Sequence, residues 1–134
     1  MANIIQQTVT LKASPKALFD TYLDARKHAA VIGDKVSIRR KVGAMFTAFG
    51  GTLKGRNLIL VPGRMIVQSW RAKSWKKTDP DSLLILQFRK VAGGGQIDLV
   101  HVGMPDYDYK PIKRGWPKYY WNPWKACLKN KTGR

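Results

Sequence analysis

The side chains that could bind a metal or act as nucleophiles are few and widely spaced in this sequence. Its two histidines are His28 and His101, and its one cysteine is Cys127. No two of these residues have the spacing of a local metal pair, and no Cys-x-x-Cys motif occurs. We therefore predict no metal site and no bound cofactor.

Acid–base catalysis has equally little support. The eight acidic residues are all aspartates, and no two of them are predicted to share one concave face. Cys127 is predicted to lie on the buried side of the C-terminal helix, where cysteine usually behaves as a small, inert apolar residue. We predict no catalytic residue, and an enzyme is kept only as an alternative.

His101 is the most informative polar residue. It is predicted to share one face of a strand with Ile97 and Leu99, because side chains two positions apart point the same way. A histidine on an apolar face can be the polar anchor of a ligand pocket. It can equally be a core histidine that is hydrogen-bonded to a neighbour, and the sequence leaves both interpretations open.

Several large aromatic residues are expected on the same inner side of the fold as His101. They are numerous enough to line a cavity and also numerous enough to fill it, so both outcomes remain open. If a ligand binds, we expect it between the sheet and the C-terminal helix, in contact with Trp70, Phe88, His101, Trp116, Tyr120 and Trp124.

Residues 113–129 (KRGWPKYYWNPWKACLK) must position several of these rings. At about 100° per residue, Trp116, Tyr120 and Cys127 fall on one line of a helical wheel. Tyr119 lies in the adjoining apolar arc. The polar arc is narrow and holds Arg114, Lys118, Asn122, Lys125 and Lys129. This pattern predicts a helix that is buried around most of its circumference, with a kink at the interior Pro123.

The rest of the chain predicts the sheet that would surround this helix. A strand at 4–11 is followed by short helices at 15–23 and 25–31, with Ser14 and Asp24 as N-caps. The following strands are expected at 36–40, 44–49, 52–61, 65–72, 83–91 and 95–102, and residues 104–110 are expected to connect the last strand to the helix. Consecutive hairpins predict an α+β fold, a curved antiparallel sheet around a long C-terminal helix.

Length and composition set the remaining expectations. The 134 residues predict one domain, 1–134, with 44% apolar residues and no run long enough to span a membrane. The N-terminus lacks a signal-peptide pattern, so we expect a cytoplasmic protein. The formal net charge of +17 indicates either an anionic partner or basic side chains scattered over the surface.

Several ordered motifs carry a family resemblance: FTAFGG (46–51), KGRNL (54–58), VPG (61–63), IVQSWR (66–71), HVGMP (101–105) and GWPKYYWNPWKA (115–126). Together they resemble the C-terminal domain of the activator of heat-shock protein 90 ATPase (AHSA-type). That family lies in the START-like, birch-pollen-allergen-like superfamily, also called SRPBCC. The resemblance covers essentially the whole chain and implies the helix-grip fold.

The resemblance implies a non-catalytic protein that binds a small hydrophobic ligand or has a chaperone partner. The eukaryotic activator has a further N-terminal domain that makes much of the chaperone contact, and we do not expect these 134 residues to contain that domain. One alternative is a cyclase or dehydratase that uses His101 and nearby tyrosines. Another is an electrostatic binder of nucleic acid or anionic lipid, but scattered lysines would give only weak, salt-sensitive binding without sequence specificity. The oligomeric state stays open.

Overall fold

One antiparallel sheet of seven strands organises the protein in the computed structural model, which describes residues 3–132. Its strand order is β1-β7-β6-β5-β4-β3-β2, so the first strand pairs with the last. The strands are β1 (Ile4–Leu11), β2 (Val36–Ser37), β3 (Met45–Ala48), β4 (Leu53–Val61), β5 (Met65–Ala72), β6 (Ser82–Val91) and β7 (Gly94–Val102).

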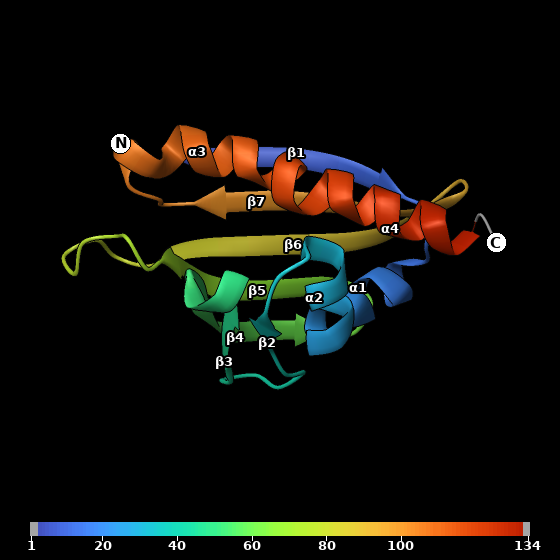
Figure 1. Ribbon diagram of the computed structural model, residues 1–134, viewed down its shortest axis with the longest axis horizontal. Helices are drawn as coiled ribbons and strands as arrows, with labels where there is room; N and C mark the ends of the chain where they lie inside the picture. The colour runs from blue at the N-terminus through green and yellow to red at the C-terminus, as the bar shows by residue number, and fades with distance from the viewer. Residues whose placement is uncertain (1–2, 133–134) are drawn as a thin grey trace.

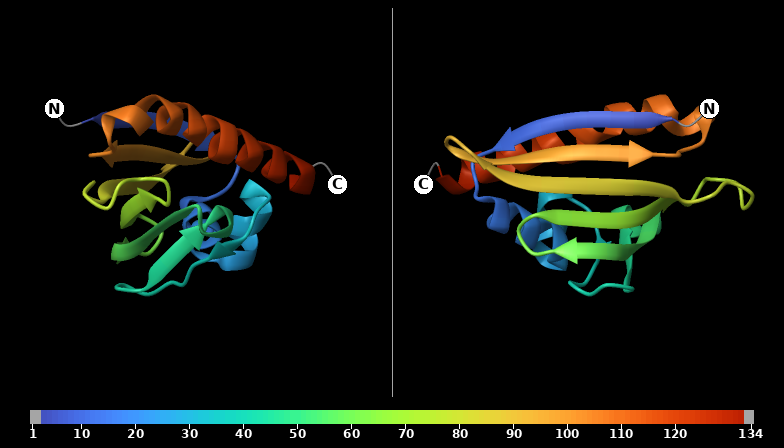
Figure 2. Two further views of the ribbon diagram at one scale, coloured as in Figure 1. Left: turned by 60° about the vertical axis from the view of Figure 1, so that its left-hand side comes forward. Right: turned by 180° about the vertical axis from the view of Figure 1, so that it is seen from behind.

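The helices lie on one side of this sheet. The C-terminal helix comprises α3 (Asp106–Trp116), the π-helical turn η2 (Pro117–Trp121) and α4 (Asn122–Thr132), and it runs across the sheet (Figure 1). The short helices α1 (Pro15–Leu23) and α2 (Ala25–Ile32) pack beneath its far end. Figure 2 shows from behind that no helix within residues 3–132 covers the other face of the sheet. This arrangement confirms the predicted helix-grip fold.

The core lies between the sheet and the helices. Along β7, Ile97, Leu99 and His101 are all buried, which confirms that they share the inner face. Leu84 and Leu86 of β6 join them in the same core. The period of two in these strands therefore places alternate side chains against the C-terminal helix.

Local sequence explains where α1 and α2 begin and end. The Ser14 hydroxyl accepts a hydrogen bond from the Ala17 N–H at 3.1 Å, and the Asp24 carboxylate accepts one from the Lys27 N–H at 3.0 Å. Each bond satisfies a backbone donor that has no partner inside its helix. Gly33 ends α2 in the left-handed conformation, with φ of 69°. The predicted caps are confirmed.

The C-terminal helix begins earlier than predicted. Residues 104–110 do not simply connect the last strand to the helix, because α3 begins at Asp106. Pro105 precedes the helix, and Asp106 and Asp108 occupy its first turn. Acidic side chains are favourable there because they face the positive end of the helix dipole. Pro111 lies inside α3 without ending it.

The irregularity of this helix also differs from the expected kink at Pro123. The structure has a π turn just before that proline, where the Asn122 N–H bonds to the Pro117 carbonyl instead of the carbonyl four residues back. Such a turn accommodates one extra residue within a helix. The helix therefore changes the phase of its side chains between α3 and α4.

Two predicted strands are shorter in the structure. The strand expected at 36–40 ends at Ser37, and the carbonyls of Arg39 and Lys41 accept hydrogen bonds from the Asn57 side chain. The strand expected at 44–49 ends at Ala48, because Phe49 has φ of 53° and begins the 3₁₀ turn η1 (Phe49–Gly51). Both differences arise from tertiary contacts and turn geometry.

Two glycine-to-alanine changes are expected to have opposite effects. At Gly55 a Cβ atom would lie 1.8 Å from the Ser69 carbonyl oxygen, so Gly55→Ala must displace backbone. We expect it to lower the free energy of unfolding by about 2–3 kcal/mol. At Gly115, inside α3, a Cβ would meet only the Tyr119 ring at 3.5 Å. Gly115→Ala is expected to raise the stability by about 0.5–1 kcal/mol. Urea unfolding of both variants measures the contrast, and equal effects would contradict it.

Candidate functional site

A pocket opens between the C-terminal helix and one end of the sheet. Its volume is about 470 Å³. Its walls come from the helix above, from η1 and the start of β4, and from the end of β5. The residues that line it are Asp34, Phe49, Thr52, Leu53, Trp70, Ala72, Ser74, Asp108, Pro111, Ile112, Gly115, Trp116, Tyr119 and Tyr120.

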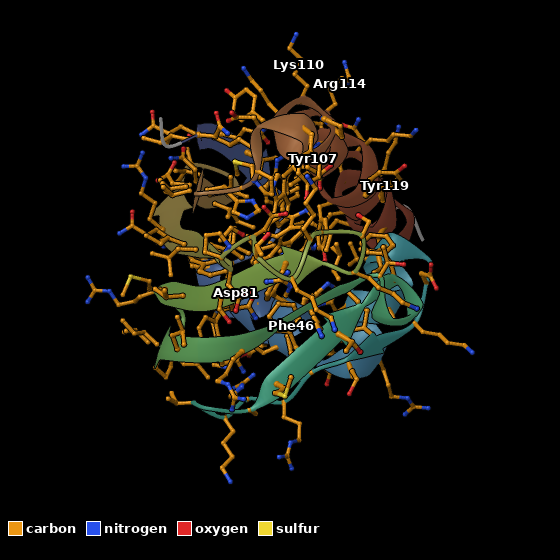
Figure 3. All side chains as sticks on the ribbon, turned by 90° about the vertical axis from the view of Figure 1, so that its left-hand side faces the viewer. Phe46, Asp81, Tyr107, Lys110, Arg114 and Tyr119 are labelled. Carbon is orange, nitrogen blue, oxygen red and sulfur yellow. The ribbon has the colours of Figure 1, made fainter. Side chains whose placement is uncertain are left out.

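The floor of the pocket is apolar and its rim is exposed. The floor residues Trp70, Trp116 and Tyr120 are each no more than 5% exposed. At the rim, Tyr119 is 47% exposed, and Asp34 is also exposed. Figure 3 views the molecule from the α3 end and shows Tyr119 beside the C-terminal helix. The pocket thus has a buried aromatic base and a solvent-accessible entrance.

The six predicted ligand contacts divide equally. Trp70, Trp116 and Tyr120 line the pocket, whereas Phe88, His101 and Trp124 are not among its lining residues. Phe88 packs edge-on against Phe19 with ring centroids 5.7 Å apart. Trp124 lies parallel to Trp121 at 6.4 Å. Ligand binding by any of the six stays a prediction.

His101 lies directly behind the pocket floor in a chain of hydrogen bonds. The Trp116 indole N–H donates to His101 Nδ1 at 3.2 Å. Because an indole can only donate, Nδ1 is the acceptor and Nε2 carries the proton. His101 Nε2–H then donates to Ser82 Oγ at 2.8 Å, and the Ser82 hydroxyl donates to the Trp70 carbonyl at 2.6 Å. This chain ties the two floor tryptophans to one another.

Burial keeps this histidine neutral. His101 has no exposed surface, and desolvation lowers its pKa to about 3. Both ring nitrogens are engaged within the fold. The geometry agrees with the interpretation as a core histidine, in which the ring orients Trp70 and Trp116 from behind.

A second buried polar chain supports Tyr120, and sequence reasoning missed it. His28 Nδ1–H donates to the Tyr22 carbonyl at 2.8 Å, which leaves Nε2 to accept from the Tyr120 hydroxyl at 2.8 Å. Burial lowers the pKa of His28 to about 4 and raises the pKa of Tyr120. At neutral pH both groups are therefore uncharged, and Tyr120 is fixed by its partner.

Tyr22 also begins a series of buried side-chain hydrogen bonds that leads into the sheet. The Tyr22 hydroxyl donates to the Gln68 side-chain oxygen at 3.0 Å, and the Gln68 amide donates to Asn57 Oδ1 at 2.8 Å. Gln68 could have indicated these buried hydrogen bonds from the sequence, because it is a polar residue between Ile66 and Trp70 on the inward face of β5. Throughout the described part of the chain, every buried side-chain nitrogen and oxygen has a hydrogen-bond partner.

The basic side chains do not gather on one face. Lys110 and Arg114 point away from the sheet on the outer side of the C-terminal helix, and other nitrogen-tipped side chains project from the opposite side of the molecule (Figure 3). Four ion pairs among the described residues hold only a few of them. Within residues 3–132, no helix has the length and apolar character required to span a membrane.

Comparison with known proteins identifies relatives of the whole fold. Residues 12–129 match the family model described as Activator of Hsp90 ATPase homolog 1-like protein. The chain is 25% identical over 107 residues to the Activator of 90 kDa heat shock protein ATPase homolog of Dictyostelium discoideum, which covers 80% of this chain and 28% of that protein. It is also 25% identical over 111 residues to the human homolog 1, with coverage of 83% and 32%.

The chain thus spans about a third of the length of these curated relatives. Among solved structures, the crystal structure of an HSP90 activator from Plasmodium falciparum superposes with a TM-score of 0.82 at 21% identity, covering 98% of this chain and 96% of that one. This similarity supports the helix-grip fold.

Proposed function

The chain belongs to the family of Activator of Hsp90 ATPase homolog 1-like proteins, and we propose that its pocket binds a small hydrophobic or amphipathic ligand without catalysis. The observation that supports this proposal is the pocket of about 470 Å³ over a floor of Trp70, Trp116 and Tyr120, with Ile112 also in its lining. Its size lies within the roughly 300–1,000 Å³ typical of small-molecule sites. Apolar surface gains free energy when a ligand replaces water there.

Binding is favoured over catalysis by the protonation states around the floor. His28 and His101 are both neutral at pH 7 and both use their two ring nitrogens within the protein. A general base must reach the proton that it abstracts, directly or through one water. Neither histidine is free to do so, and the floor rings are instead held rigidly for contact with a ligand.

A thermal-shift screen tests this proposal. The panel contains fatty acids, sterols, flavonoids and polyketide-like aromatic compounds, and tryptophan emission is recorded in parallel. A ligand at 100 times its dissociation constant stabilises the native state by about 2.7 kcal/mol, which raises the melting temperature of a domain of this size by several degrees. Because Trp70 and Trp116 line the pocket, binding should also change their emission.

A matched pair of tyrosine variants locates the ligand. Tyr119 and Tyr107 are both exposed and both belong to the C-terminal helix, but Tyr119 lines the pocket and Tyr107 does not. Tyr119→Ala is expected to weaken binding of a hit about tenfold, because one rim ring is lost. Tyr107→Ala should leave the affinity unchanged. A panel without any hit, or a hit equally affected by both variants, would overturn the proposal.

A chaperone-associated role is the second candidate. Family membership favours it, since two relatives are named as activators of the 90 kDa heat shock protein ATPase. We propose that this chain contacts such a chaperone, and we place both roles in the cytoplasm. The test is the ATPase rate of purified Hsp90 with and without this protein. An unchanged rate together with no binding in calorimetry would exclude the role.

A further inference from the structure

The rim of the pocket is acidic although the protein is strongly basic. The whole sequence has 25 lysines and arginines against eight aspartates. Two of those aspartates, Asp34 and Asp108, line the pocket. Within residues 3–132, no lysine or arginine is among the lining residues. The charged residues that line the pocket therefore have the opposite sign to the molecule as a whole, although Lys118 and Arg71 lie nearby, 5.2 Å from the Tyr119 ring and 5.7 Å from the Trp75 ring.

Aromatic rings line the same pocket as these carboxylates. Phe49 and Tyr119 lie at the rim with centroids 5.7 Å apart and nearly perpendicular planes, and the ring of Tyr120 is 6.0 Å from Phe49. The face of an aromatic ring attracts a cation within about 6 Å of its centroid. The Tyr119 ring already has such a cation, because Lys118 Nζ lies 5.2 Å from its centroid, so we do not place the ligand's cation on this ring.

The carboxylate of Asp108 is held in place by the pocket wall. Its Oδ2 accepts a hydrogen bond from the Trp75 indole N–H at 2.7 Å. Trp75 in turn packs against Trp70 of the floor, with ring centroids 5.7 Å apart. A carboxylate can accept about four hydrogen bonds, so this contact orients the group without using its full capacity. Asp108 thereby presents a fixed negative charge next to the indole ring of Trp75.

We propose that the pocket selects an amphiphile with a cationic, quaternary-ammonium-like head. The apolar body of the ligand packs on Trp70, Ile112 and Trp116, and its head lies near the Asp108 carboxylate. Carboxylates supply the charge, and the rings supply a surface that a methylated ammonium contacts without losing hydrogen bonds. This inference rests on the proposed function, because it names the ligand class of the same pocket.

The net charge of the protein does not prevent this selection. Repulsion from the distributed lysines and arginines acts over long distances and is screened beyond about 8 Å at 0.15 M ionic strength. A carboxylate a few ångströms from the head is screened much less, because little solvent and salt lie between the two charges. The local sign of the rim should therefore decide the preference at physiological salt.

Three probes with the same octyl chain test the charge preference. They are octyltrimethylammonium, octanoate and octyl glucoside, titrated below their micellar concentrations at 0.15 M salt with tryptophan emission as the readout. We expect the ammonium to bind about tenfold more tightly than the carboxylate. Equal affinities, or tightest binding of octanoate, would overturn the cation inference and leave the proposed function intact. Absence of binding by all three would contradict both.

A pair of aspartate variants tests the site. Asp108→Asn retains an oxygen that can accept from Trp75 but removes the charge, and we expect octyltrimethylammonium to bind about three- to tenfold more weakly. Asp106→Asn is the matched control, because Asp106 lies in the same first turn of α3 but does not line the pocket. Its affinity for the ammonium should not change.

The neutral probe shows that each variant keeps its pocket. Octyl glucoside should bind wild type, Asp106→Asn and Asp108→Asn equally. If Asp108→Asn leaves the ammonium affinity unchanged, or if both variants reduce it to the same extent, the rim does not recognise the cation and the inference is wrong.

Discussion

Replacing Trp116 with alanine is expected to lower the free energy of unfolding by about 4–8 kcal/mol. Removing a buried tryptophan typically costs about 3–5 kcal/mol through lost contacts and the cavity left behind. Trp116 is 3% exposed and stacks on Trp121 at 5.5 Å. Its indole N–H also satisfies His101 Nδ1, and a buried acceptor left without a donor adds about 1–3 kcal/mol.

Two further variants separate these contributions. Trp116→Phe keeps an aromatic ring but loses the indole donor, so we expect an intermediate loss of about 2–3 kcal/mol. Tyr119→Ala, on the exposed side of the same helix, should cost less than about 1 kcal/mol. Urea unfolding monitored by circular dichroism measures all three. A loss below about 1 kcal/mol for Trp116→Ala would contradict the helix-grip packing described here.

The helical wheel predicted most of this packing but failed at Tyr119 and in part at Cys127, which was expected on the buried side and is only half-buried. Trp116 and Tyr120 are buried, and Arg114 and Lys118 are exposed, as expected from 113–129. Tyr119 was placed in the apolar arc but is 47% exposed. A wheel at about 100° per residue assumes an unbroken α-helix, whereas Tyr119 lies in the π turn. No simple periodicity of the sequence encodes that change of phase.

The pocket was only partly predictable for a different reason. Ring size and helix phase identified Trp70, Trp116 and Tyr120. Asp34 and Asp108 lie far apart in the sequence, and only the completed fold brings both to the lining of one pocket. His101 was predicted to face inward and does so, but its partners Ser82 and Trp116 come from other elements. Hydrogen bonds between residues that are distant in the sequence cannot be predicted from the local pattern of residue types.

Lowering the pH from 7 to 4.5 is expected to remove about 5 kcal/mol of stability. His28 and His101 have pKa values of about 4 and about 3 in the folded protein, against about 6.5 in an unfolded chain. Between those values the unfolded state binds more protons than the folded state, so stability falls as the pH decreases. Each histidine contributes about 1.4 kcal/mol per pH unit across that window.

The pKa values of His28 and His101 are low because both rings are buried and hydrogen-bonded behind the pocket. Each ring accepts a hydrogen bond at one nitrogen, from Tyr120 at His28 and from Trp116 at His101. Protonation would replace that acceptor with a second donor and also place a charge in the core. Among the aspartates, a hydrogen bond from Lys16 lowers the pKa of Asp20, so that group loses its contribution only at lower pH.

Urea unfolding at a series of pH values measures this loss, and His28→Gln provides the control. Between pH 6 and 4.5 we expect a slope of about 2.7 kcal/mol per pH unit for the wild type and about 1.4 for the variant, because only one buried histidine then remains. Proton NMR of the two imidazole rings gives an independent readout, since folded protein should show no histidine titration near pH 6.5. Stability that is constant from pH 7 to 5, or an unchanged slope in His28→Gln, would show that the two rings are not held neutral by the fold.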